Sequence, residues 1–199
     1  MGKRHHPSLI GQRPLPRFWL MTDERLGDQL LACVAALPPG AGIIFRHYAT
    51  PAAARRALFD RVRRLARRRR QVLLFAGSPR QARAWGADGS HGRHFGAVTA
   101  PVHGIAQMRR AEQCGARLLF LSPVFPTRSH PNARVLGRVK FGALCQAARR
   151  PVIALGGMTR ARARQLAPLG IYGWAAIDGW MPANGRSAVK GQKRNAVPR

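Results

Sequence analysis

The feature that most constrains the fold is a repeated alternation of short apolar runs with longer segments of helical periodicity. The clearest run is Leu118–Leu121, which predicts a strand buried on both faces, as in a parallel sheet. Seven other runs predict strands in the same way: Phe18–Met21, Gly42–Phe45, Val72–Phe75, a brief strand ending at His91, Ala97–Thr99, Pro151–Leu155 and Tyr172–Ile177. Eight strand–helix units favour an α/β fold, a compact single-domain (β/α)8 TIM barrel. An open doubly wound sheet is the alternative, but no G-x-G-x-x-G follows the first strand.

Several helix boundaries can be predicted from capping residues between these runs. Thr22–Asp23 can cap a helix that continues to Pro38, and Thr50–Pro51 predicts a threonine cap followed by proline at the first helical position. Arg67–Arg70 indicates a solvated helix end, where cations are favourable. Thr159 is predicted to cap the helix that follows the seventh strand.

The chain of 199 residues is predicted to contain one domain. Residues 17–180 would form the barrel, after a flexible basic N-terminal segment at 1–16 and before a disordered basic tail at 181–199. No apolar run approaches the length of a membrane span, and the N-terminus lacks the apolar region of a secretory signal. We therefore expect no membrane association and a cytoplasmic location.

The formal charge of +28 results from 35 lysines and arginines against only seven acidic residues. Such a charge can indicate nucleic-acid binding, or simply an arginine-rich composition spread over solvent-facing helices. The arginines fall at outer helical positions and do not alternate with aromatic residues as a stacking platform would, which favours the second interpretation. Nucleic acid is then expected to bind only non-specifically if at all, whereas phosphorylated ligands should be attracted.

Polar residues follow three of the predicted strands, where a barrel would place its functional face. Thr127, Arg128, Ser129 and His130 follow the sixth strand and offer hydroxyls and cations suited to an anionic group. Gly156–Gly157 after the seventh strand could present backbone N–H groups to a phosphate. The turn Ile177–Asp178–Gly179 after the eighth strand would complete that phosphate site.

Histidines and cysteines give no metal-ligand pattern. Five of the seven histidines lie near predicted strand ends, but their spacing matches no compact ligand motif, so no metal residue is assigned. His103 or His130 could serve in acid–base chemistry, because histidine titrates near neutral pH; each could equally be a hydrogen-bonded scaffold residue. The three cysteines, without a CxxC motif, are predicted to be small apolar residues.

Five segments, in order along residues 15–180, together resemble the thiamine-phosphate synthase and thiazole tautomerase family. They are FWLMTD from Phe18, GADGSH from Gly86, VHG from Val102, the segment from Gly115 that ends in PVFPT at Thr127, and PVIALGG from Pro151. The family's corresponding pieces are LYLITD, GADGVH, VHS, GADYVGFGPVFPT and PVVAIGGI. The sequence is thus similar to a family of small (β/α)8 barrels.

The resemblance implies a transferase of thiamine biosynthesis that joins hydroxymethylpyrimidine diphosphate to thiazole phosphate and releases diphosphate with Mg²⁺ assistance. Arg46 aligns with the arginine of the family's Q-x-R-x-K strand, and Thr127 and Ser129 align with the hydroxyls of its T-x-T-K loop. Gly157 and Ile177 correspond to the thiazole-phosphate cradle. Arg46 and His130, the latter at the position of the diphosphate-binding lysine, are the expected catalytic residues.

The sequence also departs from the family pattern. Ala76–Gly77 replaces an Asn–Asp pair and no acid follows His94, so the Mg²⁺ expected from the family finds no ligands. Asp178 replaces a small serine at the cradle, where its charge should repel a phosphate. The tautomerase branch has its catalytic histidine where this chain has Pro123. Three functions therefore stay open: synthase, a divergent member that binds a phosphorylated ligand, and a basic nucleic-acid-associated protein. The oligomeric state is not predicted.

Overall fold

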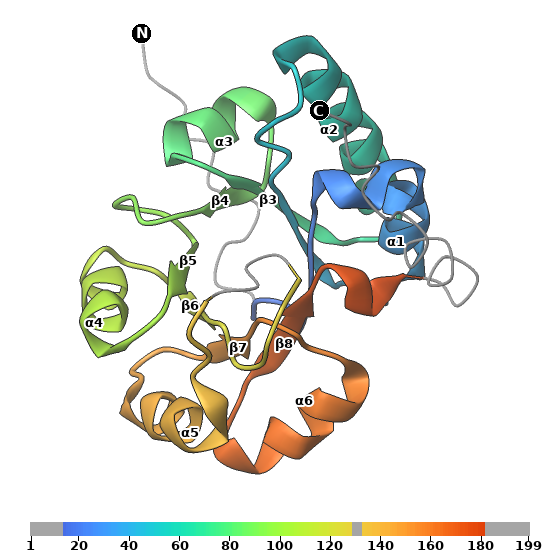
Figure 1. The fold of residues 1–199 in the computed structure, drawn as a ribbon. Helices are drawn as coiled ribbons and strands as arrows, with labels where there is room; N and C mark the ends of the chain where they lie inside the picture. Colours follow the sequence, from blue (N-terminus) through green and yellow to red (C-terminus); the bar gives the residue numbers. More distant parts are fainter. Residues whose placement is uncertain (1–13, 129–132, 182–199) are drawn as a thin grey trace, which may run out of the picture.

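Eight parallel strands close into a barrel in chain order, with the helices arranged around them (Figure 1). The computed structural model describes residues 14–128 and 133–181. The strands are β1 Phe18–Met21, β2 Gly42–Phe45, β3 Val72–Ala76, β4 Gly89–His91, β5 Thr99–Val102, β6 Leu118–Leu121, β7 Val152–Ala154 and β8 Gly173–Ala176. The predicted (β/α)8 TIM barrel is confirmed, and β1, β2 and β6 have the predicted bounds.

The helices and 3₁₀ segments occupy the connections between strands. The α-helices are α1 Leu30–Ala36, α2 Ala52–Arg68, α3 Pro79–Trp85, α4 Ile105–Gln113, α5 Gly137–Ala147 and α6 Arg160–Leu166. The 3₁₀ segments are η1 Glu24–Gln29, η2 Ala167–Leu169 and η3 Asp178–Trp180. Most of the predicted segments 1–16 and 181–199 lies outside the described residues, so those two predictions stay untested.

Two helix starts differ from the sequence predictions, and one agrees. The helix predicted after Asp23 is divided into η1 and α1, because Gly27 has a φ of 44°, which no helix accommodates. Pro51 is the N-cap of α2 itself, without a side-chain cap, so its assignment to the first helical position was wrong by one residue. Thr159 caps α6 as predicted, accepting a hydrogen bond from the Arg162 N–H.

The fifth strand is the other correction, because it continues through Pro101 to Val102. Proline cannot donate to a strand ladder, which is why the sequence suggested an earlier end. The pairing explains the difference. β4 meets β5 only where His91 pairs with Thr99, so Pro101 lies beyond its neighbour and its missing N–H costs no hydrogen bond.

Apolar side chains form one cluster inside the barrel and two between the strands and helices. Trp19 and Phe120 meet edge to face inside the barrel, with ring centroids 5.4 Å apart. Each such fully buried side chain contributes about 1.5–3 kcal/mol to the free energy of folding. A side chain at Gly42 would collide with the Trp19 ring, so glycine there is what admits the indole to the interior.

The chain closes the barrel at the amino ends of its strands as it enters β1. Leu15 is buried among the interior residues, and its carbonyl accepts a hydrogen bond from the Tyr172 hydroxyl at 2.6 Å. The Trp19 indole N–H donates to the Pro16 carbonyl at 2.7 Å. The interior is therefore packed from this end, and the opposite end is left for a site.

Within the described ranges, none of the helices combines the length and the apolar character needed to cross a membrane.

Candidate functional site

A cavity of about 1220 Å³ opens at the carboxyl ends of the strands. Five of the residues selected from the sequence line it: Arg46, Thr127, Gly157, Ile177 and Asp178. They come from four different strand ends, so the closed barrel brings them together. The other two selected residues, Ser129 and His130, lie outside the described part of the chain.

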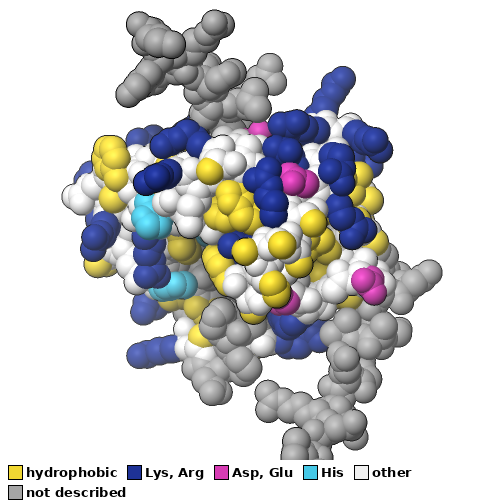
Figure 2. All heavy atoms as spheres, turned by 90° about the horizontal axis from the view of Figure 1, so that it is seen from above, with side chains coloured by type: hydrophobic (Ala, Val, Ile, Leu, Met, Phe, Trp, Pro, Cys, Tyr) yellow, Lys and Arg dark blue, Asp and Glu magenta, His cyan; other side chains and the backbone are white. Residues whose placement is uncertain are grey.

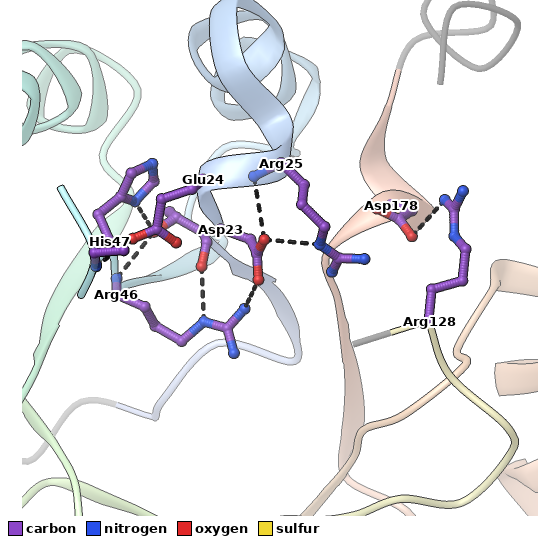
Figure 3. Close-up of polar contacts among 9 residues, drawn as sticks. Asp23, Glu24, Arg25, Arg46, His47, Arg128 and Asp178 are labelled. Carbon is purple, nitrogen blue, oxygen red and sulfur yellow. Dashed lines mark hydrogen bonds and ion pairs between the residues drawn. The ribbon is translucent and has the colours of Figure 1, made fainter. Parts of the chain in front are cut away.

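Arg46 follows β2, and acidic and carbonyl oxygens hold its guanidinium at the cavity wall (Figure 3). It donates to the Asp23 carboxylate at 2.6 Å and to the Thr22 carbonyl at 2.7 Å. Burial lowers the pKa of Arg46, but a guanidinium still remains charged. Burial would raise the pKa of Asp23, but the hydrogen bonds and charges of Arg25 and Arg46 outweigh it and lower that pKa. Asp23 is thus an anion shared between two arginines.

Buried groups behind Arg46 fix its backbone. The Arg46 N–H donates to the Thr22 hydroxyl at 2.9 Å, and that hydroxyl in turn contacts His47 Nδ1 at 2.9 Å. His47 stacks on Phe45, and burial lowers its pKa, which favours a neutral imidazole. Arg55 donates to the Arg46 carbonyl through Nε at 3.1 Å and Nη2 at 2.6 Å. Arg46 is therefore positioned by Thr22, His47 and Arg55.

The Arg55 guanidinium also lies against aromatic rings. Its central carbon is 4.8 Å from the Phe75 ring centroid and 5.4 Å from that of Trp85. Burial lowers the pKa of Arg55. Its i+9 position relative to Arg46 gives no sequence signal for the contact, because only the crossing of α2 over β2 and β3 creates it.

The loop after β6 and the turn after β7 pack directly on each other through their backbones. The Val124 N–H donates to the Leu155 carbonyl at 3.0 Å, and the Phe125 N–H to the Gly156 carbonyl at 3.2 Å. Gly157 has a φ of 60°, and a Cβ there would overlap the Pro126 carbonyl. Arg162 donates to the Gly157 carbonyl. Gly157 is thus required for the close approach of the two loops that form this wall.

Asp178 is neutralised within the site. Its carboxylate accepts from the Arg128 guanidinium at 2.6 Å, so the loops after β6 and β8 meet across the mouth (Figure 3). The expectation that Asp178 repels phosphate considered the carboxylate alone. The ion pair presents a guanidinium with remaining N–H donors beside it. The two side chains are 57% and 34% exposed, so the pair is accessible to a ligand.

Two histidines line the cavity, one buried and one exposed. His91 is buried, contacts the Thr99 hydroxyl through Nδ1 at 2.8 Å, and burial lowers its pKa to about 3. It is a neutral scaffold group. His103 is exposed, and its Nδ1 lies 2.7 Å from the Ser122 carbonyl. A carbonyl only accepts, so Nδ1 carries the proton and neutral His103 keeps its lone pair on Nε2.

Two further arginines line the cavity without having been selected from sequence. Arg134 follows the β6 loop, and Arg160 is the first residue of α6, directly after the Thr159 cap. Both side chains are exposed. The signal for Arg160 was available, since it immediately follows the predicted Gly156–Gly157 cradle and its cap; Arg134 had none.

The residues present do not fit a magnesium site. All seven acidic residues of the chain lie in its described part, and Asp178 alone among them lines the cavity. Its carboxylate is paired with Arg128, and that of Asp23 with Arg25 and Arg46. Mg²⁺ sites need oxygen donors, usually one or two carboxylates, and here the nearest ones are bound to guanidiniums. Among the described residues, no group of three or more histidine, cysteine or acidic side chains could hold a metal ion.

The cationic side chains extend well beyond the site. Figure 2 shows arginines and lysines spread around one face of the molecule, with few acidic side chains between them. They do not gather along one groove on that face, which agrees with the interpretation of a generally basic surface.

Comparisons with known proteins agree with this fold. A family model described as "Thiamine monophosphate synthase" matches residues 92–179. A thiamine-phosphate synthase of Pyrococcus furiosus is 33% identical over 86 residues, which is 43% of this chain and only 42% of that protein. A solved thiamine phosphate pyrophosphorylase from Pyrococcus furiosus superposes with a TM-score of 0.73 at 24% identity, covering 87% of this chain and 92% of that one.

One relative matches along most of its length. A thiamine-phosphate synthase of Methylococcus capsulatus is 30% identical over 186 residues, which cover 83% of this chain and 82% of that protein. The closed eight-stranded barrel accords with this likeness. The chain belongs to the thiamine-phosphate synthase family.

Proposed function

We propose that this protein is a thiamine-phosphate synthase, which joins hydroxymethylpyrimidine diphosphate to thiazole phosphate and releases diphosphate. The observation that supports this best is that Arg46, Thr127, Gly157 and Ile177, which correspond to substrate-binding positions of the family, share one cavity of about 1220 Å³. That volume is above the usual range for a single small ligand, as two substrates bound together require.

Each substrate would use a different part of the cavity. The wall formed by Gly157 and Ile177 would hold the phosphate of the thiazole. Arg46 and Arg128, with Thr127, would face the diphosphate, because guanidiniums donate paired N–H bonds to phosphate oxygens. His130 remains a candidate for the same role on sequence grounds alone.

The reaction needs charge stabilisation more than proton transfer. The bond between the pyrimidine methylene carbon and the diphosphate oxygen breaks, and both electrons leave with the oxygen. The lone pair of the thiazole nitrogen then forms the new C–N bond, so no proton has to move. The arginines would stabilise the negative charge that develops on the leaving oxygen, in a geometry fixed by contacts such as that between Arg55 and Arg46.

Turnover with both substrates tests the proposal, with formation of thiamine phosphate and diphosphate as the readout. Arg46→Gln should lower kcat by about tenfold to a hundredfold, since it removes charge next to the leaving group. Arg64→Gln, at an exposed position on the outer face of α2, is the matched control and should keep the parent rate. Absence of product at any substrate concentration, together with failure to rescue a thiamine-requiring strain that lacks its own synthase, would reject the proposal.

A second candidate is a family member that binds a phosphorylated small molecule without synthase activity. It is favoured by one specific observation: Asp178, which lines the cavity, and Asp23, which holds Arg46, are both paired with arginines, leaving neither carboxylate for the family's metal. Saturable binding of thiazole phosphate without turnover would identify this case. The third function, a nucleic-acid-associated protein, receives no support from the comparisons.

A further inference from the structure

We infer that this cavity binds the phosphate groups of its ligand through guanidiniums alone, without a bridging divalent cation. The inference deepens the proposed function and rests on it for the identity of the anion, a diphosphate ester. Its basis is the balance of charged groups around the cavity. Four arginines line it, Arg46, Arg128, Arg134 and Arg160, against the single carboxylate of Asp178.

Six of the seven acidic side chains have ion-pair or hydrogen-bond partners. Asp60 pairs with Arg56 and Arg63 on α2, and Glu112 pairs with Arg109 on α4. Asp88 accepts the Leu73 N–H at 2.7 Å, and Glu24 accepts the Ala49 N–H at 2.8 Å. Asp28 is exposed on η1 and lies outside the cavity lining. No rearrangement of a nearby spare acid could therefore supply a metal ligand.

The guanidiniums, in contrast, have donors to spare. Among the described residues, neither Arg134 nor Arg160 takes part in an ion pair, and both are exposed at the mouth. Each arginine has five N–H donors in a planar fork that matches two phosphate oxygens, and it stays charged at any ordinary pH. A divalent cation and these arginines would each neutralise the negative charge of the diphosphate oxygens. The site therefore needs either the cation or the arginines, but not both.

Asp178 then has a specific part in this arrangement. Its 2.6 Å pair with Arg128 competes with the ligand for that guanidinium. Removal of the carboxylate charge should therefore tighten anion binding, which is the opposite of what is expected for a metal ligand. The sign of this effect separates the two possibilities.

The test is titration calorimetry of the full-length chain with inorganic diphosphate, in EDTA and again with excess MgCl₂. We expect the affinity in EDTA to equal or exceed that in Mg²⁺, since Mg²⁺ neutralises part of the free anion. Asp178→Asn should tighten binding by about threefold to tenfold, and Arg160→Gln should weaken it by a similar factor, as for one charge-assisted contact at an exposed site.

Two results would overturn the inference. The first is at least tenfold weaker binding in EDTA that MgCl₂ restores, with Asp178→Asn weakening it further. The second is equal weakening by Arg160→Gln and by the control Arg64→Gln, since that would indicate diffuse attraction to the basic surface only. Synthase turnover, measured separately, distinguishes the proposals. Turnover that requires Mg²⁺ would support the synthase proposal and reject this inference. Metal-independent diphosphate binding without turnover would support this inference and reject the synthase proposal.

Discussion

The two halves of the barrel mouth are built by different means. In the half formed by β5–β8, the loop after β6 and the turn after β7 are joined by backbone hydrogen bonds, such as that from the Val124 N–H to the Leu155 carbonyl, and by the positive φ of Gly157. In the half formed by β1–β4, side chains dominate: Arg46 is held by Asp23 and by Arg55. The family model matches residues 92–179, which lie almost wholly in the half formed by β5–β8.

The contrast explains why family membership and chemistry are supported unequally. A wall built from backbone contacts needs glycine and proline at fixed places, and such residues carry the resemblance in the segments that end in PVFPT and ALGG. A wall built from side chains can change its charges while the barrel stays intact, because strand pairing does not depend on them. In the half formed by β1–β4, Ala76–Gly77 is such a change, and Asp178 is one in the other half. The fold can therefore be identified largely from backbone features, whereas the metal question has to be judged from charged side chains of both halves, such as Asp23 and Asp178.

Substitution of Gly157 should have the largest effect, because this residue lies in the wall built from backbone contacts. Gly157→Ala would place a methyl group against the Pro126 carbonyl in a left-handed conformation, and should cost about 3 kcal/mol of folding free energy or more. It should also abolish phosphate binding at that wall. Gly104→Ala is the matched control, since nothing lies within 4 Å of its Cβ and its φ of −178° suits any residue. Urea unfolding measures the loss of stability, and phosphate titration measures the loss of binding. Substitutions at neutral surface sites change the free energy of unfolding by about 0.5 kcal/mol or less. If Gly157→Ala differs from the control by no more than that, the wall is not held by backbone packing.

A smaller effect is expected from pH in the other half. The folded-state pKa of His91, about 3, lies below its ordinary value of 6.5, so the unfolded chain binds more protons between these values. Stability should therefore fall as the pH is lowered through this window, by about 2 kcal/mol from pH 6.5 to 5. Burial also lowers the pKa of His47, which adds to the slope. His91→Asn should reduce the slope, while His94→Asn, at an exposed position, should not. Equal slopes in both variants would mean that His91 is not buried in its neutral form.

The smallest effect concerns the ion pair of Asp23 and Arg46. A double-mutant cycle with Asp23→Asn and Arg46→Gln should give a coupling free energy of about 1 kcal/mol, at the upper end of the usual range for surface pairs, because both side chains are less than one-fifth exposed. The cycle is measured by urea unfolding. The same cycle with Arg128→Gln and Asp178→Asn should give less, since that pair is more exposed. Equal coupling free energies would show that the two halves do not differ in this respect, and the reverse order would contradict the prediction.

The parts of the fold that could be predicted from sequence are those decided by local patterns. The run Leu118–Leu121 predicts a buried strand, and Thr159 caps its helix by accepting a hydrogen bond from the Arg162 N–H, three residues away. Pro51 shows the limit of such rules, because a helix start is uncertain by a residue when no side chain caps it.

The site could be predicted only in part, because its side chains meet across the barrel. The departure from the family's metal-binding carboxylates can be predicted from sequence, because the positions of the seven acidic residues can be compared with those of the family's motifs. The contact of Arg128 with Asp178, fifty residues apart, does not follow, nor does that of Arg55 with Arg46. An isolated aspartate at a phosphate site suggests repulsion, whereas the structure adds the arginine that changes its meaning.

The buried entry of the chain at Leu15 and Pro16 has one further consequence. Among the described residues, Trp19, Phe120 and the segment before β1 fill the barrel at the amino ends of the strands, and the cavity lies at the opposite end, beside Arg128 and Asp178. A ligand that enters such a pocket leaves by the way it came. If two molecules occupy it together, the one seated deeper arrives first and departs last, so the order of binding is set by depth rather than by affinity.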